Sequence, residues 1–463
     1  MMNRREFIKN CSLGLISVPL LNISCKSFSS GSQPNILFIL SDDAGYDDFG
    51  FHGGTDIPTP NLDRLAANGI VFTDAHVTAT VCSPSRAGML TGRYQQRFGH
   101  EANSPGHSQG MDPAEVTLAD ALKKLNYRTG LFGKWHLGMS DEYHPNNRGF
   151  DEFYGLLGGS RSYFPSENQD KSGRPQAMMH NDQYVRFEGY LTDVLTEKAI
   201  AFMEADDDRP FFTFVSYTAV HTPMEARKEY LEMFKDHPRP VLAAMTHAMD
   251  EGVGRIMGSL EKSGRLNDTL IIFTNDNGGS AFNTSSNDPL KGWKGNKFEG
   301  GSRVPFLVHW KDHLAGRRTF QGITSTLDIF ATAFTCAGGK NHGGNHLDGV
   351  NLIPYLKGES QGNPHDWLFW RKEEEAAVRW KEWKLIRLQD YGYVLYNLEE
   401  NLGETENLVN QYSEISNKMK QALENWESEL VEPAWHESQD WRDVTWQIHK
   451  DLMENRKPEK IHP

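Results

Sequence analysis

Apolar residues in the first two thirds of the chain form short, nearly continuous runs of strand length. Such runs are typical of strands buried on both faces of a parallel sheet. They are residues 35–40, 128–132, 211–217 and 269–274. The stretches between them are predicted to hold helices, at residues 61–69, 117–125, 192–204 and 240–263. Strands that alternate with helices predict an α/β fold, with a mostly parallel sheet sandwiched by helices.

The pattern changes near residue 364. Four short alternating runs follow, which predict an antiparallel sheet, and apolar positions between residues 415 and 430 predict a helix that covers it. Because 463 residues are too many for one ordinary core, we expect a large domain at 34–363 and a smaller α+β domain at 364–463. Residues 146–190 are predicted to be irregular. The tryptophans of the tail, Trp435, Trp441 and Trp446, are expected to pack onto the small domain.

The amino terminus has the composition of a leader. Arg4 and Arg5 precede an apolar stretch that ends near Cys25, and this resembles a twin-arginine export signal with a lipoprotein-type cysteine. We therefore expect a bacterial protein exported to the periplasm or anchored to the outer membrane through lipidated Cys25. Residues 26–33 would be a linker. The alternative is an amino-terminal amphipathic helix.

Charge and cysteine content narrow the choice of partners. With 48 Lys and Arg against 62 Asp and Glu, the formal net charge is −14, so nucleic acid is not an expected partner. A membrane is expected only through the lipid anchor. An anionic substrate would need a local basic pocket. Outside residues 1–25, the cysteines are Cys82 and Cys336, so we expect no disulfide framework.

Polar residues follow the predicted buried strands directly. Open α/β sheets bind ligands at the carboxyl ends of such strands. The residues concerned are Asp42, Asp43, Lys134, His136, His221, Asp276 and Asn277. Adjacent acids in a turn are either solvated turn formers or metal ligands, and the residues alone leave both readings open.

A twelve-residue segment at 82–93 reads C-S-P-S-R-A-G-M-L-T-G-R. Its small residues open a predicted helix whose first turn would direct backbone N–H groups and Arg86 at an anion. The segment resembles the signature of the formylglycine-dependent sulfatases of the alkaline-phosphatase superfamily, in the bacterial carbohydrate sulfatase type. Other segments also match the family, and all of them occur in the family's order along the chain. They lie at residues 34–46, 133–138, 148–155, 293–301 and 395–408. The resemblance implies an alkaline-phosphatase-like fold.

It also implies a modified nucleophile. In that family a maturation enzyme oxidises the cysteine, here Cys82, to formylglycine (3-oxoalanine), whose hydrate attacks sulfur. A geminal diol suits this chemistry because one hydroxyl attacks and the other later expels sulfate.

The remaining family positions transfer residue by residue. A calcium site would consist of Asp42, Asp43, Asp276, Asn277 and an oxygen of modified Cys82. Hard oxygen ligands favour calcium or magnesium, and the family binds calcium. The resemblance places Arg86, Lys134 and Lys294 around the sulfate. It implies that His221, with Lys294, protonates the leaving alcohol and that His136 accepts a proton during sulfate release.

The substrate expected from these features is a sulfated oligosaccharide. Polar loops at 94–103 and 158–164 offer His100, Arg161 and Tyr163 as candidate sugar contacts. The parent glycan would be an algal polysaccharide such as ulvan or carrageenan, or a glycosaminoglycan. Two alternatives stay open: a formylglycine-dependent phosphonate or phosphate ester hydrolase, and an inactive lipoprotein that binds sulfated glycans.

Overall fold

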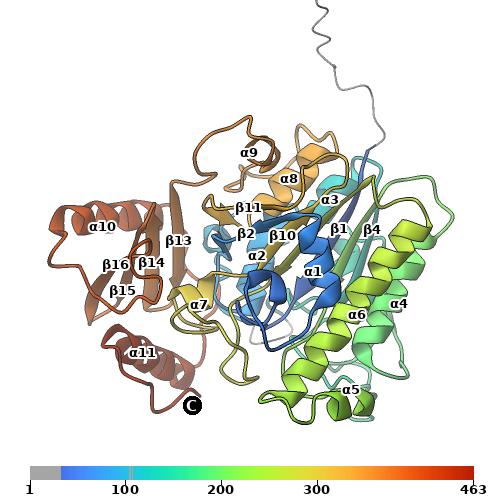
Figure 1. Ribbon diagram of the computed structural model, residues 1–463, viewed down its shortest axis with the longest axis horizontal. Coiled ribbons are helices and arrows are strands. Elements are labelled where there is room, and N and C mark those ends of the chain that lie inside the picture. The colour runs from blue at the N-terminus through green and yellow to red at the C-terminus, as the bar shows by residue number, and fades with distance from the viewer. Residues whose placement is uncertain (1–32, 104–105, 107, 463) are drawn as a thin grey trace, which may run out of the picture. The chain divides into compact units, whose positions relative to one another are not determined.

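A ten-stranded sheet organises the larger part of the protein in this computed structural model (Figure 1), which describes residues 33–103, 106 and 108–462. The strand order is β11-β2-β10-β9-β1-β8-β4-β5-β6-β7. The five neighbouring strands β9, β1, β8, β4 and β5 run parallel. The strands of this sheet are β1 (Asn35–Ser41), β2 (Ile70–Phe72), β4 (Arg128–Lys134), β5 (Glu152–Leu156), β6 (Met178–His180), β7 (Gln183–Tyr184), β8 (Phe211–Ser216), β9 (Thr269–Asn275), β10 (Phe306–His309) and β11 (Arg318–Phe320).

Helices cover both faces of this sheet. The helices of this part are α1 (Pro60–Ala67), α2 (Cys82–Thr91), α3 (Leu118–Lys123), α4 (Leu191–Glu204), α5 (Lys228–Met233), α6 (Pro240–Lys262), α7 (Glu299–Ser302), α8 (Asp328–Cys336) and α9 (Ile353–Leu356). Leu37 and Ile39 of β1 pack in one core with α1, α4 and α6. Ile36 and Phe38 pack in another with α2, α3 and α8. Burial on both faces explains the continuous apolar run, and the predicted α/β sandwich is confirmed.

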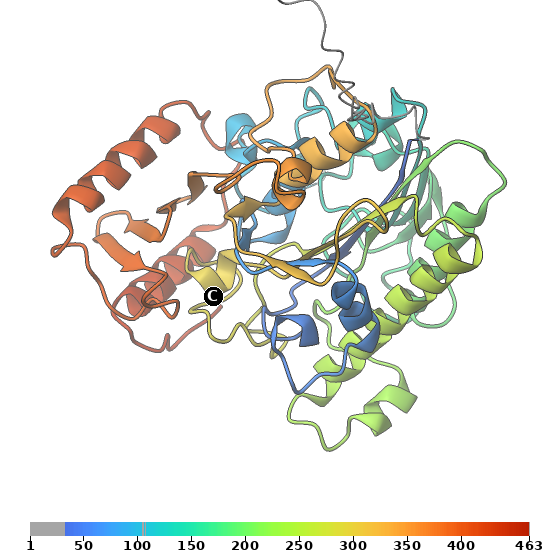
Figure 2. The same cartoon turned by 45° about the horizontal axis from the view of Figure 1, so that its top comes forward.

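A four-stranded antiparallel sheet follows in the carboxy-terminal part (Figures 1 and 2). Its elements are β13 (Trp367–Lys372), β14 (Glu375–Trp380), β15 (Trp383–Leu388), β16 (Gly392–Asn397), α10 (Ser413–Glu427) and α11 (Gln439–Met453). Ala376 and Val378 face α10, whereas Ala377 and Ile386 face α11. Each face of this small sheet is therefore covered by one helix.

Two sequence expectations differ from the structure. The region expected to be irregular contains β5, which pairs with β4, and the β6–β7 hairpin. These strands are short, and their stability comes from pairing with the sheet, not from local periodicity. The tail forms α11, which was not predicted. A remaining two-stranded pair joins β3 (Ala75–His76) to β12 (Thr324–Ser325).

The predicted leader, including Cys25, lies outside the described residues, as does the linker up to residue 32. Export and lipidation therefore stay predictions. Residues 34–463 form one compact unit, and the proposed boundary at 363/364 also stays a prediction. Within the described ranges, no helix is both long and apolar enough to cross a membrane.

We expect a buried carboxylate beside α11 to make the stability of the protein depend on pH. Glu375 is 1% exposed, and neither of its carboxylate oxygens has a hydrogen-bond partner among the described residues. His449 of α11 approaches it, with Nδ1 3.9 Å from Oε1. Burial raises the pKa of Glu375 to about 7, although Lys297 opposes this.

We expect Glu375→Gln to gain stability relative to the wild type as pH rises from about 5 to about 8. The folded pKa of about 7 lies above the ordinary value of 4.5, so the contribution of Glu375 is present below the ordinary value and is lost as pH rises through 7. Glutamine keeps the shape and cannot ionise. Urea unfolding at both pH values gives the free energy of unfolding of the variant and of the wild type. The difference between these two free energies should change by on the order of 1 kcal/mol between the two pH values. Exposed Glu400→Gln is the control, and a pH-independent difference for Glu375→Gln would contradict the prediction.

Candidate active site

The carboxyl ends of β1 and β9, which are neighbouring parallel strands, bring together four oxygen-bearing side chains. Asp42 and Asp43 follow β1, and Asp276 and Asn277 follow β9; all four are at most 2% exposed. Asp43 has φ 61°, a left-handed conformation that aspartate tolerates better than most residues. Its carboxylate accepts a hydrogen bond from Asn277 Nδ2 at 2.9 Å. Asn277 Oδ1 is buried with no hydrogen-bond partner in the described part of the chain.

Cys82 lies beside this cluster as the first residue of α2 and is 1% exposed. One ligand atom from each of Asp42, Asp43, Cys82 and His221 lies within 4.8 Å of the others. Burial opposes ionisation of the thiol, but Lys134 and Lys294 lower the pKa of Cys82 to about 7. The amino-terminal turn of α2 thus holds residue 82 in a positively charged environment.

Three cations surround these acids. Arg86, one turn further along α2, donates from Nη2 to Asp42 at 3.1 Å and to Asp276 at 2.9 Å. Lys134, at the end of β4, places Nζ 2.6 Å from Asp42. Lys294 Nζ lies 2.6 Å from Asp43 Oδ1 and 3.1 Å from Cys82 Sγ. Three carboxylates therefore face three permanent cations in a buried cluster.

The two predicted histidines lie at the same edge of the sheet. His221 Nδ1 lies 2.6 Å from the carbonyl of Thr222, so this nitrogen carries a proton and Nε2 faces Asp43 at 3.5 Å. Burial opposes protonation of His221, but Asp43 raises its pKa. His136 has φ 62°, and its ring packs against Gly159. A Cβ added to Gly159 would lie only 2.7 Å from that ring. Burial and then Lys134 hold the pKa of His136 well below its usual value, so its imidazole is neutral.

The three candidate sugar contacts are buried and engaged with protein groups. His100 Nε2 lies 2.7 Å from Ser83 Oγ, and burial lowers the pKa of His100 to about 3. Arg161 pairs with Asp170 at 2.8 Å. Tyr163 donates to the backbone carbonyl of Thr218 at 2.5 Å. His100 thus contacts Ser83 beside Cys82, and Tyr163 contacts the loop before His221. A sugar-binding role for all three residues stays a prediction.

Some supporting residues were missed from the sequence. Ser83 Oγ donates to the carbonyl of His136 at 2.6 Å and so holds the loop that carries this histidine. Ser216 Oγ accepts from Arg86 at 2.6 Å. Gly133 has φ 126°, and a Cβ there would stand 1.8 Å from the Ser216 carbonyl oxygen, so only glycine fits before Lys134. Ser83 lies inside the 82–93 segment, but no local pattern marked Ser216 as a partner of Arg86.

The small sheet anchors the loop that carries Lys294. Glu299 Oε1 accepts from Lys384 Nζ of β15 at 2.7 Å, and the Glu299 backbone N–H donates to Glu404 at 2.7 Å. Lys291 Nζ donates to the Glu404 carbonyl at 2.9 Å. These contacts join residues 291–299 to the carboxy-terminal part of the chain, so that part helps to position Lys294.

A second group of potential metal ligands, Asp74, His76 and Glu299, lies beneath this loop. Arg379 binds Asp74 at 2.6 Å, and Arg303 binds Glu299 at 2.6 Å. Because cations already compensate both acids, we interpret this group as an ion-pair network and not as a metal site.

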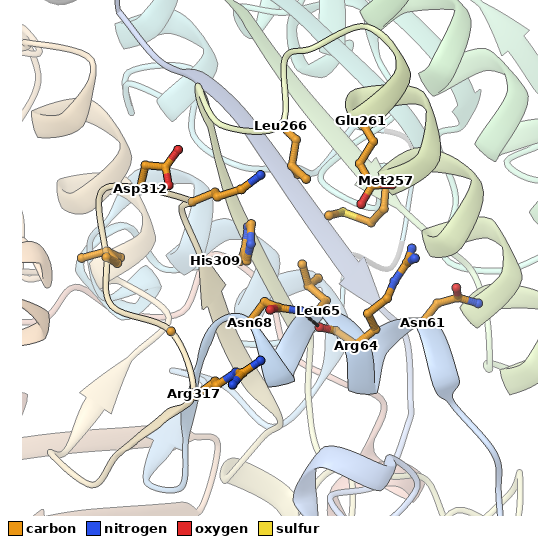
Figure 3. A pocket seen from close by; sticks show the side chains of 13 residues that line it. Asn61, Arg64, Leu65, Asn68, Met257, Glu261, Leu266, His309, Asp312 and Arg317 are labelled. Atoms are coloured by element: carbon orange, nitrogen blue, oxygen red, sulfur yellow. Dashed lines mark hydrogen bonds between the residues drawn. The ribbon is translucent and has the colours of Figure 1, made fainter.

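A cavity of about 530 Å³ opens onto the candidate site. Asp43, His221 and Lys294 line it together with Trp441 of α11. A further cavity of about 420 Å³ lies at the amino end of β9, between α1, the end of α6 and His309 (Figure 3). Parallel sheets bind ligands at the opposite end of their strands, and none of the predicted site residues lines this further cavity.

One expectation for the tail needs correction. Trp446 packs onto the small sheet as expected and donates to the Gln389 carbonyl at 2.9 Å. Trp435 is also buried, at 8% exposed, but it packs against the larger part of the chain and donates to the Asn103 carbonyl at 3.1 Å. Trp441 is 42% exposed and lines the cavity. It is exposed because its position on α11 faces the active-site cavity and not the small sheet.

Comparisons with known proteins show the family of this chain. Residues 34–339 match the protein family described as Sulfatase. Steryl-sulfatase of Mus musculus is 31% identical over 437 residues, which cover 75% of this chain and 69% of that protein. N-acetylgalactosamine-6-sulfatase of Mus musculus is 33% identical over 357 residues, covering 72% and 68%.

A solved structure extends the similarity over the carboxy-terminal part. The crystal structure of Ps i-CgsB in complex with k-i-k-neocarrahexaose is 34% identical in sequence, covers 93% of this chain and 100% of that one, and has a TM-score of 0.84. The family match covers most of the described chain, and the relatives carry the same activity in their names. The chain belongs to the sulfatase family and is a sulfuric ester hydrolase.

Proposed function

We propose that this protein hydrolyses sulfate esters on oligosaccharides of a sulfated polysaccharide, with formylglycine formed from Cys82 as the nucleophile. The convergence of buried Cys82 with three acids and three cations at one sheet edge carries the proposal. The 34% identical Ps i-CgsB, crystallised with k-i-k-neocarrahexaose, supports a carrageenan-type substrate over ulvan or a glycosaminoglycan. A maturation enzyme would be the partner that modifies Cys82.

The acid cluster fits a calcium ion held by Asp42, Asp43, Asp276, Asn277 and an oxygen of the modified residue 82. The fit rests on the Asn277 Oδ1 atom, which is buried without a partner among the described residues, and on hard oxygen donors that suit calcium. When bound, the ion would supply positive charge beside the sulfate group. Three carboxylates and three protein cations nearly cancel, so a divalent ion would leave the site positive, as an anionic ester requires.

The hydrate of formylglycine would supply the attacking hydroxyl. Around it, Lys134, Lys294 and Arg86 hold positive charge where the sulfate oxygens gain negative charge. His221, whose Nε2 faces the site, holds the proton that the leaving alcohol needs. His136 has a neutral imidazole and so accepts a proton when sulfate is released.

The leaving-group role yields a direct test. We expect His221→Gln to lower kcat/KM on a sulfated oligosaccharide by about 10²–10⁴-fold. Loss on 4-nitrophenyl sulfate should be much smaller, because nitrophenolate leaves without protonation. Sulfate release from both substrates is measured for each variant.

Lys311→Ala serves as the control, because this exposed lysine lines the cavity at the other end of β9. Equal losses on the two substrates would refute the leaving-group role. A panel of carrageenan, ulvan and glycosaminoglycan oligosaccharides tests the substrate. Strong phosphonate or phosphate ester hydrolysis without desulfation of any glycan would favour the alternative function.

A further inference from the structure

The cavity at the active site has a wall that the sulfatase signature does not account for. Segment 436–449, made of the loop before α11 and most of that helix, lines one part of it. Catalytic candidates His221 and Lys294 line another part. At about 530 Å³, the cavity is within the range of small-ligand pockets, about 300–1,000 Å³. It therefore has room for much more than a sulfate group.

We propose that segment 436–449 is the sugar-binding wall of this cavity and that Trp441 packs against the face of a sugar ring of the substrate. This inference rests on the proposed carbohydrate sulfatase function. A pyranose ring presents C–H groups on its faces and hydroxyls at its edge, so an aromatic ring flanked by polar groups matches it. Nothing in the signature segments assigns a role to this wall.

The exposure of Trp441 sets it apart from the other tail tryptophans. Its side chain is 42% exposed, and no hydrogen bond or ring contact holds the indole in the described part of the chain. Trp435 stacks edge-on against His100, and Trp446 packs against the small sheet. Large apolar side chains left exposed inside a cavity are typical of ligand contacts.

A second exposed aromatic residue lines the same cavity from another element. Phe282, in the loop after β9, is 47% exposed, and its ring centroid lies 6.3 Å from that of His462. Trp293, next to Lys294, adds a third aromatic side chain. Three aromatic residues, one from α11 and two from the loop between β9 and α7, thus line one cavity beside the catalytic lysine.

Polar groups of the same wall can bind sugar hydroxyls. Ser438 and Thr445 come from the segment itself, and Asn103 comes from the loop that also carries His100. His436 is half exposed, at 54%, and its Nδ1 lies 2.8 Å from Glu373. Lys372 and Glu437 also line the cavity, but they pair with each other at 2.9 Å. Apolar faces with hydroxyl, amide and imidazole groups and a charge-balanced pair favour a neutral sugar ring over a second sulfate at this wall.

Trp441→Ala is the variant that tests the inference, compared with Trp441→Phe and with Tyr391→Ala. Tyr391 is a matched control because it is 40% exposed, belongs to the same carboxy-terminal part and does not line the cavity. Kinetics are measured on the oligosaccharide that the wild type desulfates best. Binding of that oligosaccharide is measured calorimetrically in a Cys82→Ala background, where turnover does not interfere.

We expect Trp441→Ala to raise KM and weaken calorimetric binding by about tenfold or more, with kcat changed less than about threefold. Trp441→Phe should retain most of the affinity, and Tyr391→Ala should match the wild type. Wild-type KM and affinity in Trp441→Ala would overturn the inference while leaving the proposed function intact. A wild type that neither binds nor desulfates any glycan of the panel would overturn the proposed function, and this inference with it.

Discussion

Replacing Cys82 with alanine is expected to lower kcat for sulfate ester hydrolysis by about 10⁴-fold or more, because it removes the precursor of the proposed nucleophile. Stability should change little in comparison, because a small residue still begins α2. The ion pairs of Arg86 and Lys134 with Asp42 also remain without the sulfur. Sulfate release and thermal unfolding are measured on the same preparations.

The same preparations also test whether Cys82 is converted to formylglycine. Peptide mass spectrometry of active wild-type enzyme should show formylglycine at position 82 and unmodified Cys336. Cys336→Ala is the control, because Cys336 is the second free cysteine of the described residues and lies on α8, outside the site. Full activity in protein that carries an unmodified thiol at position 82 would contradict the proposed chemistry.

Asp43→Asn is expected to remove bound calcium and to lower kcat by about 10²-fold or more. Asparagine tolerates the left-handed backbone of residue 43, where φ is 61°, so the change removes charge without forcing the loop to move. It also removes the partner of Lys294, whose Nζ lies 2.6 Å from Asp43 Oδ1. Metal content by mass spectrometry and turnover are the two measurements.

Calcium should also stabilise the wild type. Binding to the folded state alone raises the free energy of unfolding, by about 2.7 kcal/mol at a hundredfold excess over Kd. This increase should disappear in Asp43→Asn and persist in Asp47→Asn. Asp47 lies in the same loop but accepts a hydrogen bond from Ser286 at 3.2 Å, outside the acid cluster. One calcium per chain and normal turnover in Asp43→Asn would show that the metal assignment is wrong.

The order of the main elements and the position of the site were predictable from the chain. The run at residues 35–40 is buried on both faces of the sheet, and Asp42 and Asp43 follow it directly. Local sequence determines these features because a buried parallel strand needs apolar residues on both faces, and its carboxyl end is where polar residues can converge. The calcium, the formylglycine and the exact glycan stay proposals.

Other features depend on contacts between residues far apart in the sequence. Tyr163, expected to meet sugar, donates to the carbonyl of Thr218 and so supports the loop before His221. The anchoring of the Lys294 loop by Lys384 joins residues that no periodicity connects. Such contacts arise only when the chain folds, because each depends on which segment packs beside which.

The tail illustrates the division between sequence and tertiary structure. Its composition established that tryptophans are present, and the expectation that they pack onto the small domain holds for Trp446. Trp435 packs instead against His100 and Asn103 of the larger part. Only the tertiary structure decided that Trp441 faces the active-site cavity, since three tryptophans of similar sequence context meet three different surroundings. The physical reason is that the exposure of a side chain depends on what covers it, whereas the apolar pattern of a strand or helix reflects the chain's own geometry.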